Sequence, residues 1–454
     1  MTVSPARAPL GTPAPSPAAL TALEAELVAL LGARGVTADL RARERASVDG
    51  ARMSPIISEL LPLGVADLVA RPATAADVGP VVAAAVRHGV PVTPRGKGTG
   101  NYGQAIPMAG GLVLDLSRAR AVVELGDGWI TAEAGTPMVV LERAAAETGQ
   151  QLWMYPSTAQ SSLGGFLGGG SGGTGTIAHG SNDMGFVLAL DVVHATGSPA
   201  LVHVEGDEAQ RYVHNYGTAG VIARATVRLE PLQDWRGVYA SFPDFRRALS
   251  VLRELGRLQP LPRLVSADTP EITATLPPDP AFPAGRASLR MIADARTVTA
   301  ATALVEGAGG RVEAVREGAQ VALSLSMLSY NHPIEWLQKS RPGVFFHVEV
   351  SGDALVERID EVHAVYEGGL LHVEAGHTVP IGMLAGVYRS PEQVRDGIRA
   401  LGALGVGVHD PHQWNVDFEL GRTIETARST DPHGLLNPGK LNPDYDGPTK
   451  GAIR

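Results

Sequence analysis

The chain has 454 residues, of which 44% are hydrophobic, enough for two domains or for one domain with a large insertion. Its net charge of −9 argues against a nucleic-acid partner, because phosphate binding needs clustered Lys and Arg side chains and no dense basic run occurs. The chain has no cysteine, which excludes disulfides, thiolate metal sites and cysteine nucleophiles. This composition fits a cytoplasmic protein.

Pro and Ala dominate residues 1–18, and we expect a disordered leader there rather than a secretory signal. Leu20, Leu23 and Leu27 follow at helical spacing, which predicts an amphipathic helix over 18–31. No stretch is long and apolar enough to span a bilayer, so we expect no membrane span.

The next part of the chain mixes helices and strands. Thr74 and Asp77 form a capping-box pair that starts a helix ending at Gly89. We then expect strands at 90–94, 112–116, 122–125 and 129–134, a helix over 137–148, a hairpin of 188–194 with 201–204, and a strand over 221–229. Pro231 stops that strand and marks a domain boundary, so we expect the first domain to span 19–234.

From residue 235 the pattern changes. Two strand–helix–strand units follow, at 288–292, 297–307 and 312–315, and at 344–350, 354–366 and 370–374. Such units build an antiparallel sheet with helices on one face, which predicts a second domain over 235–405. Residues 406–454 then carry a strand near 406–416 and a Pro/Gly-rich tail.

The strongest motif is the glycine-rich loop of residues 94–103. Closely spaced glycines let backbone N–H groups approach phosphate oxygens. Gly98, Gly100 and Gly103 also satisfy GxGxxG, but a dinucleotide site of the Rossmann type needs a helix directly after the loop. Here a strand follows, so that reading is rejected.

A second glycine-rich stretch covers residues 156–180. Its hydroxyls offer hydrogen-bond donors to a phosphate or to a ring carbonyl. Leu163, Phe166, Leu167 and Ile177 are interspersed among the glycines, which favours a packed loop over a flexible linker. Near the C-terminus, residues 434–440 mimic a P-loop. Leu441 replaces the required Ser or Thr and Pro443 precludes the following helix, so a triphosphatase is rejected.

Six landmarks in this order resemble the PCMH-type FAD-binding domain of the vanillyl-alcohol-oxidase and p-cresol-methylhydroxylase superfamily. They are Arg-Pro-Ala-Thr at 71–74, the loop at 94–103, Glu-Ala-Gly at 133–135, the Pro-Ser stretch at 156–165, residues 216–222, and Leu-Asn-Pro-Gly-Lys at 436–440. The resemblance covers roughly residues 50–235 and the tail. It implies a two-domain α+β fold in which a cap domain, built on an antiparallel sheet, is inserted into the FAD domain.

The resemblance also implies roles for single residues. The residues expected to bind FAD are Arg95, Gly96, Lys97, Gly98, Thr99, Gly100, Asn101, Tyr102, Ser157, Ser161, Ser162, Gly164, Gly165, Gly175, Gly180, Ile222, Asn437 and Lys440. The first eight would contact the pyrophosphate, Gly175 and Gly180 would lie near the adenosine half, and the last two would return from the C-terminus toward the flavin ring.

Thr99 stands where members that bind FAD covalently through this loop have His, so we expect noncovalent FAD there. Other members use a histidine of the cap instead, and a covalent bond from the cap stays open as an alternative. The candidates are His332, His347, His372 and His377.

His409, Asp410 and His412 lie where related enzymes place a Tyr-Arg pair over the substrate. Imidazoles and a carboxylate beside a flavin are suited to removing a hydroxyl proton, so we expect these three residues to be catalytic. A solvated turn or a weak metal site is an equal alternative. His372 and Glu374 share one face of a cap strand, yet the family's metal pattern is not reproduced, and we expect no metal.

The resemblance implies an FAD-dependent oxidoreductase that oxidises a CH–OH or CH–NH substrate by hydride transfer to flavin N5. A 2-hydroxyacid dehydrogenase is the alternative within the enzymes, and a catalytically silent flavin-binding subunit is the alternative of another class. We expect a small-molecule substrate, with a homodimer left open. Aromatic candidates for lining the substrate pocket are Tyr330, Trp336, Tyr366, Tyr388 and Trp414.

Overall fold

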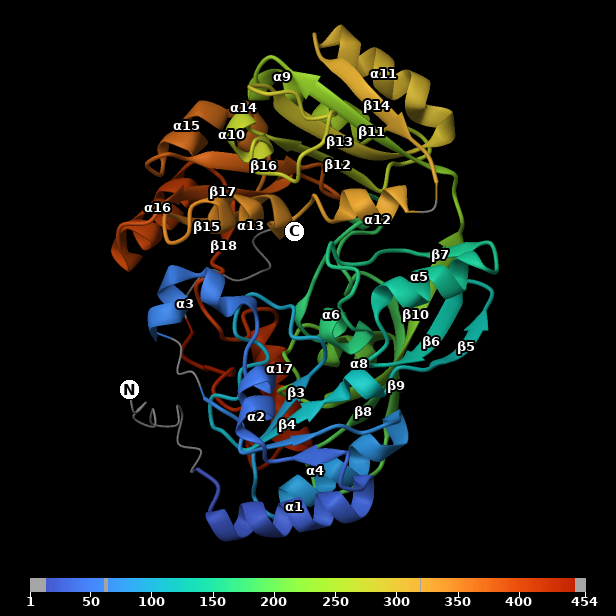
Figure 1. Cartoon of the computed structure of the whole chain (residues 1–454), viewed down its shortest axis with the longest axis vertical. Helices are drawn as coiled ribbons and strands as arrows, with labels where there is room; N and C mark the ends of the chain where they lie inside the picture. The colour runs from blue at the N-terminus through green and yellow to red at the C-terminus, as the bar shows by residue number, and fades with distance from the viewer. Residues whose placement is uncertain (1–13, 61–63, 319, 446–454) are drawn as a thin grey trace.

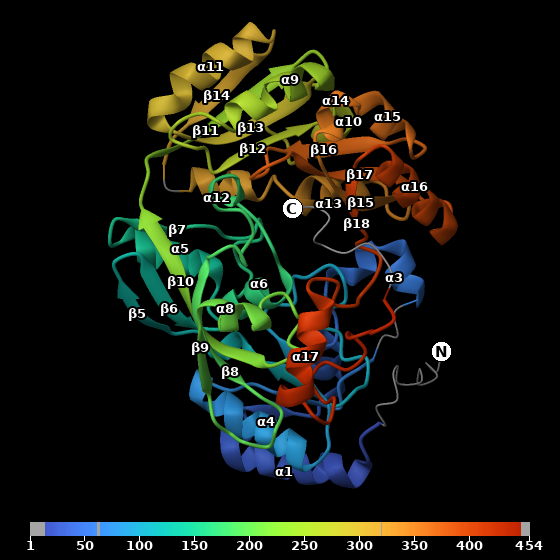
Figure 2. The same cartoon turned by 180° about the vertical axis from the view of Figure 1, so that it is seen from behind.

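The computed structural model describes residues 14–60, 64–318 and 320–445. A lower domain contains the first and last helices of the described chain, and an upper domain is stacked on it (Figure 1). The long strand β10 (Val221–Pro231) leads from the lower domain up to the first strand of the upper one (Figure 2). This arrangement agrees with the predicted α+β class and with a cap built on an antiparallel sheet.

The lower domain begins with a four-stranded sheet. Its strands run in the order β1 (Val36–Thr37), β2 (Leu68–Ala70), β4 (Leu112–Asp115) and β3 (Val92–Arg95), and only β1 is antiparallel to its neighbour. Helices α1 (Pro17–Leu31) and α4 (Val78–Arg87) pack on it. The predicted capping box of Thr74 and Asp77 is present, directly before α4. The C-terminal segment returns to this sheet, since Val92 N–H donates to Leu435 O.

The second sheet of the lower domain is antiparallel. Its order is β5 (Val122–Gly126), β6 (Trp129–Glu133), β10, β8 (Val187–Val193) and β9 (Val202–Glu205), and β7 (Gln150–Leu152) also pairs with β10. Further α-helices of this domain are α2 (Leu40–Ala46), α3 (Pro55–Leu60), α5 (Met138–Ala146), α6 (Leu163–Gly169), α7 (Thr176–His179) and α8 (Gly206–Ala209). One continuous core joins the two sheets, with the buried side chains of α6 between them.

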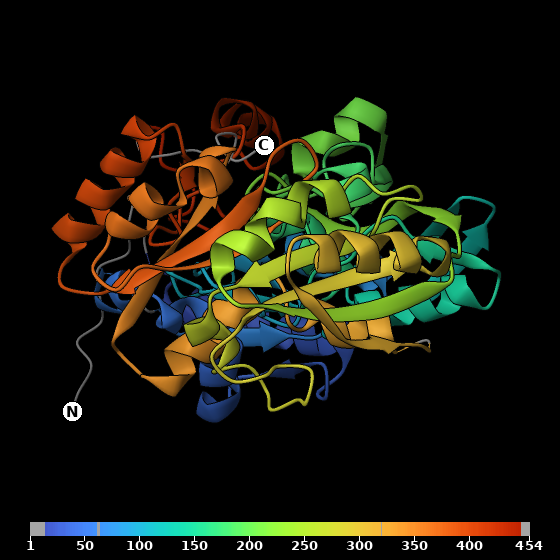
Figure 3. The same cartoon turned by 90° about the horizontal axis from the view of Figure 1, so that it is seen from above.

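The cap is an eight-stranded antiparallel sheet. Its order is β14 (Arg311–Arg316), β11 (Trp235–Phe242), β13 (Ala287–Asp294), β12 (Leu264–Asp268), β16 (Leu370–Glu374), β17 (Ile381–Val387), β15 (Phe345–Ser351) and β18 (Gly407–His409). Its outer face is apolar. The helices that cover that face, seen from above in Figure 3, are α9 (Phe245–Leu255), α11 (Val298–Gly307), α14 (Ala354–Glu357), α15 (Ile359–Ala364) and α16 (Pro391–Ala403).

The inner face of the cap sheet is turned toward the lower domain. Parts of it are covered by α10 (Pro270–Thr273), α12 (Val321–Ser326) and α13 (Asn331–Ser340). This face carries buried polar side chains in the alternating positions of several strands, among them Asp268, Arg290, Glu349 and His372. Buried polar groups cost free energy unless they are hydrogen-bonded, so the side chains of this face need polar partners within the protein or on a ligand.

Two segments differ from the prediction. Residues 164–180 contain α6 and α7 rather than a packed loop, because Ser162 caps α6 and Leu163, Phe166 and Leu167 form one buried face. The predicted strand of 406–416 shortens to β18, which belongs to the cap sheet, and the predicted tail contains α17 (Leu420–Thr430). The buried side chains of α17 are threonines, so hydrophobic spacing gave no signal.

The predicted leader lies mostly outside the described residues, and its last two residues already belong to α1. Among the helices of the described part of the chain, none has the length and apolar character needed to cross a membrane.

Candidate functional site

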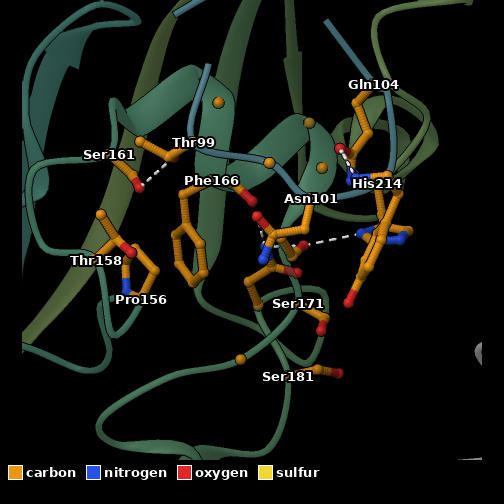
Figure 4. A pocket seen from close by; sticks show the side chains of 18 of the residues that line it. Thr99, Asn101, Gln104, Pro156, Thr158, Ser161, Phe166, Ser171, Ser181 and His214 are labelled. Atoms are coloured by element: carbon orange, nitrogen blue, oxygen red, sulfur yellow. Dashed lines mark hydrogen bonds between the residues drawn. The ribbon is translucent and has the colours of Figure 1, made fainter. Parts of the chain in front are cut away.

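A cavity of about 540 Å³ runs from the glycine-rich loop of the lower domain to the inner face of the cap. Figure 4 shows its wall in the lower domain, where Thr99, Ser161, Phe166, Ser171 and His214 surround the same space. Most residues predicted to bind the cofactor line it: Arg95, Gly96, Lys97, Gly98, Thr99, Gly100, Asn101, Tyr102, Ser157, Ser161, Ser162, Gly164, Gly165, Gly180 and Ile222.

The two glycine-rich stretches meet at the floor of the cavity. A Cβ on Gly96 would lie 1.9 Å from Ser162 Oγ, so only glycine allows this approach. The Thr99 and Ser161 hydroxyls lie 2.7 Å apart, and the dashed line between them in Figure 4 marks this hydrogen bond. Gly98 has a φ of +64°, which turns the loop at a position where a side chain would be strained. These contacts form a cradle of backbone N–H groups that suits a pyrophosphate.

The far wall of the cavity offers a buried acceptor. Asn182 is 1% exposed, and its Nδ2 donates to Phe166 O and Gly170 O at 3.0 Å each. Its Oδ1 has no hydrogen-bond partner among the described residues, although the atom is buried. An unpaired buried acceptor costs free energy, and a donor on a bound ligand would remove that cost.

Three of the predicted cofactor residues do not line the cavity. Lys440 is fully buried, and its Nζ donates to Gly103 O at 2.5 Å. Asn437 Nδ2 donates to Gln104 O and Tyr216 O, both at 2.8 Å. These two residues therefore hold the loop from behind, and burial lowers the pKa of Lys440 to about 7 against the attraction of Asp49. Gly175 packs against Trp153 and donates to Arg263 O instead.

At the cap end, four side chains from distant parts of the chain form one cluster. Tyr102 from the glycine-rich loop hydrogen-bonds Glu349 of β15, and both line the cavity. Behind them, His409 Nδ1 lies 3.0 Å from Glu349 Oε2, and His409 Nε2 lies 2.6 Å from Asp417 Oδ2. Against the effect of burial, the two carboxylates raise the pKa of His409 to about 9, so the ring is a cation at neutral pH.

The structure separates the three residues predicted to be catalytic. None of them lines the cavity, and His409 reaches it only through Glu349. His412 Nδ1 lies 2.6 Å from Ser54 Oγ, and burial lowers the pKa of His412 to about 4. Asp410 accepts a hydrogen bond from the His412 backbone, and burial raises the pKa of Asp410. In this arrangement Glu349 lines the cavity, and His409 contacts its carboxylate from behind.

The cap histidines have different surroundings. His377 lines the cavity, with its Nδ1 3.0 Å from Ile177 O, whereas His332 lies outside it, 3.1 Å from Thr158 Oγ1. His347 is buried, and burial lowers its pKa to about 4. These contacts do not test whether a cap histidine forms a covalent bond to FAD. The noncovalent attachment of FAD therefore stays a prediction.

His372 belongs to a buried charge network rather than to the cavity wall. Its two ring nitrogens lie 2.7 Å from Asp268 and 2.9 Å from Glu374, and despite burial these carboxylates raise the pKa of His372 to about 9. Glu374 also accepts the Tyr330 N–H at 2.6 Å. Within the described ranges, no three His, Asp or Glu side chains are grouped so as to hold a metal ion.

Of the five aromatic candidates, Tyr330 lines the cavity. Its backbone has a φ of +52°, which is strained for a tyrosine, and its hydroxyl donates to Gly173 O at 2.7 Å. Trp336 is on the surface, Tyr366 packs in the outer core, Tyr388 borders that core, and Trp414 packs against Ile106 and Met108. The sequence reasoning missed Glu349. The alternation of His347 and Glu349 on an otherwise apolar strand was the signal for it.

Comparison with known proteins supports FAD as the ligand of this cavity. Residues 66–200 match the family described as FAD binding domain. An uncharacterized FAD-linked oxidoreductase of Mycobacterium tuberculosis is 31% identical over 195 residues, which are 41% of this chain and 42% of that protein. A D-lactate dehydrogenase of Archaeoglobus fulgidus is 27% identical over 42% of this chain and 45% of its own. The glycolate oxidase subunit GlcD of Bacillus subtilis is 29% identical over 36% of this chain and 37% of its own.

These matches span less than half the length of the curated relatives. A solved structure of alkyldihydroxyacetonephosphate synthase extends the likeness to the whole fold. It superposes with a TM-score of 0.73 over 96% of this chain and 87% of its own, at 16% sequence identity. At that identity the likeness concerns the fold alone.

Proposed function

From the match of residues 66–200 to the FAD binding domain family and from the cavity described above, we propose that this chain is an FAD-dependent oxidoreductase acting on a CH–OH or CH–NH substrate at the cap end of the cavity. The family match confirms the predicted resemblance and FAD as the cofactor. The activity is our proposal, since the curated relatives are matched over less than half their length.

The residues present fit FAD. Glycine at position 96 lets the loop approach the second glycine-rich stretch, since a Cβ there would lie 1.9 Å from Ser162 Oγ, and Asn182 Oδ1 offers an acceptor to the adenine end. Thr99 is hydrogen-bonded to Ser161 and has no group able to bond a flavin carbon. We propose that this loop holds FAD without a covalent bond, with Lys440 and Asn437 fixing the loop from behind.

When bound, FAD supplies the acceptor for the hydride. The chain's own contribution is a proton acceptor beside the substrate. Glu349 faces the cavity, and two donors fix its carboxylate, the Tyr102 hydroxyl and the His409 ring. Burial and Glu349 raise the pKa of Tyr102 well above its usual value, so Tyr102 stays protonated and donates. We propose that Glu349 takes the substrate's hydroxyl or amine proton and that His409 positions Glu349.

The observation that carries this proposal is the single cavity that joins the glycine cradle to Glu349. A 2-hydroxyacid dehydrogenase is favoured by the names of the relatives from Archaeoglobus fulgidus and Bacillus subtilis. A catalytically silent flavin-binding subunit would need the glycine cradle alone, and the Glu349 cluster would have no role in it.

The absence of cysteine supports a cytoplasmic location, and a homodimer stays a prediction.

Anaerobic photometry of the purified FAD-loaded protein tests the proposal. Alcohols, 2-hydroxyacids and amines are added in turn, and bleaching of the bound flavin by at least one of them is the expected result. A flavin that dithionite reduces and none of these compounds reduces would instead support the silent subunit. Acid precipitation of the same sample should leave the flavin in the supernatant if FAD is noncovalent.

A further inference from the structure

The charges along the cavity are unevenly distributed. Among the described residues, the Lys and Arg side chains that line it are Arg95 and Lys97, both on the glycine-rich loop. Arg95 Nη1 donates to Val48 O, so this guanidinium is engaged by a backbone carbonyl of the lower domain. At the cap end the carboxylates are those of Glu335 and Glu349. The cap end therefore has acidic groups and, in the described part of the chain, no Lys or Arg.

The cations behind the cap wall are already paired. The His409 cation lies between Glu349 and Asp417, so one positive charge faces two negative ones. Arg290 is fully buried, lies 2.5 Å from Asp268, and does not line the cavity. A substrate anion at the cap end would find these cations engaged.

Glu335 forms an ion pair with Lys339, whose side chain is exposed on the surface. Lys339 lies 3.3 Å from the Glu335 carboxylate, and this cation is directed to solvent rather than to the cavity. Although burial opposes it, His332 and Lys339 hold the pKa of Glu335 at about 2. Glu335 therefore stays ionised across the range in which enzymes work.

Apart from the ring of His377, whose Nδ1 lies 3.0 Å from Ile177 O, the remaining groups at the cap end are uncharged. Tyr102, Tyr330 and Asn331 offer hydroxyl and amide groups, and Ile381 and Met383 offer apolar surface. A hydroxylated, uncharged molecule can donate to the carboxylate and accept from the amide. A carboxylate or phosphate would meet like charge in a partly desolvated site without a guanidinium or ammonium to pair with.

From this arrangement we propose that the cap end selects an uncharged hydroxylated substrate and rejects its carboxylate- and phosphate-bearing analogues. The selection rests on the proposed oxidoreductase function and narrows it. It runs against the substrates named for the D-lactate dehydrogenase and glycolate oxidase relatives, whose matches cover less than half of this chain.

Matched ligands that differ only in charge test this selection. The pairs are propane-1,2-diol with lactate, ethylene glycol with glycolate, and xylitol with xylonate, each added to the FAD-loaded full chain. Binding is followed by the absorbance change of the oxidised flavin and by the ligand-induced shift in Tm, which need no turnover. The neutral member should bind at least about tenfold more tightly in each pair. Equal binding, tighter binding of the carboxylate, or no binding of any neutral member overturns the proposal.

Thr378 provides a charge-reversal variant with a matched control. It lines the cavity at the cap end and is exposed, so Thr378→Arg is expected to fold. Thr378→Arg should shift the preference toward the carboxylates by about tenfold, and Thr378→Gln should keep the wild-type preference. An unchanged preference in Thr378→Arg, with wild-type Tm and flavin content, contradicts the charge argument.

Flavin reduction, measured separately, tells the two proposals apart. If lactate or glycolate bleaches the flavin and the diols do not, the selection is wrong and the oxidoreductase function stands. If dithionite is the one reagent that bleaches it, the oxidoreductase function fails, and the binding ratios still decide what the cap end selects.

Discussion

The ring of His409 and the carboxylate of Glu349 lie 3.0 Å apart on neighbouring cap strands, and they connect the C-terminal segment to the cavity. The motif around His409 drew attention in the sequence, yet it is Glu349 that faces the ligand space. We therefore propose that the pair divides two tasks, with Glu349 contacting the substrate and His409 positioning Glu349.

Replacing His409 should impair positioning without preventing ligand binding. We expect His409→Gln to lower kcat by roughly tenfold or more with little change in KM, since a hydrogen bond to a charged group contributes about 1.5–3 kcal/mol. The pKa of about 9 for His409 also predicts a basic limb near that pH in wild type, and its loss in the variant. His412→Gln is the control, because His412 contacts Ser54 instead. A basic limb that persists in His409→Gln contradicts the positioning role.

The buried network of His372 should make stability depend on pH. The pKa of His372 is about 9 in the folded chain against a reference of 6.5, so folding favours the protonated ring. The stabilisation is fully present below about pH 6.5 and is lost as the pH rises through about 9. The difference in free energy of unfolding between wild type and His372→Gln should thus be largest at acidic pH and shrink toward pH 9.

Urea unfolding at a series of pH values measures this difference, and other titrating groups cancel in the comparison. The exposed His433→Gln serves as the control and should differ from wild type by the same small amount at each pH. A difference between wild type and His372→Gln that grows with pH would show that the ring is not held as a cation.

Gly96 should be essential for holding FAD. In Gly96→Ala the new methyl would lie 1.9 Å from Ser162 Oγ, so the two glycine-rich stretches must separate. The expected result is purified protein with little or no bound flavin, measured from the ratio of flavin to protein absorbance. Gly402→Ala is the matched control, since a Cβ there meets nothing within 4 Å. Full flavin content in Gly96→Ala would show that the cradle does not hold the cofactor.

The parts of this site that the sequence predicts are those whose contacting residues lie close together in the chain. The cradle is local, because Gly96 and Thr99 lie in one short motif, and it was predicted residue by residue. The pairing of Glu349 with His409 spans 60 residues and depends on strand register, which no local pattern reveals. The alternation of His372 with Glu374 marked a polar face, but their partner Asp268 lies on another strand.

The secondary structure was missed for similar reasons. Helix α6 contains four glycines and was read as a loop, although its cap Ser162 and its buried Leu163 and Phe166 satisfy a helix. Helix α17 buries threonines against the lower domain, so its packing depends on tertiary contacts rather than on an apolar stripe.

Lys440 should contribute to FAD affinity from behind the loop. Lys440→Met removes the 2.5 Å hydrogen bond to Gly103 O while filling the same buried space. We expect FAD to bind roughly tenfold more weakly, measured by titration of the apoprotein and followed by flavin fluorescence. Lys339→Met, on the exposed surface of α13, should leave the affinity unchanged. Wild-type affinity in Lys440→Met would mean that this contact is structural alone.

The central claim is that the cavity couples FAD to Glu349 as the proton acceptor. It is tested most directly by anaerobic stopped-flow reduction of wild type and Glu349→Gln with a substrate that bleaches the wild-type flavin. Glu335→Gln is the control, since Glu335 lines the same end but is paired with His332 and Lys339 instead. We expect Glu349→Gln to retain full FAD but to be reduced at least about a hundredfold more slowly. Equal reduction rates in wild type and Glu349→Gln would contradict the claim.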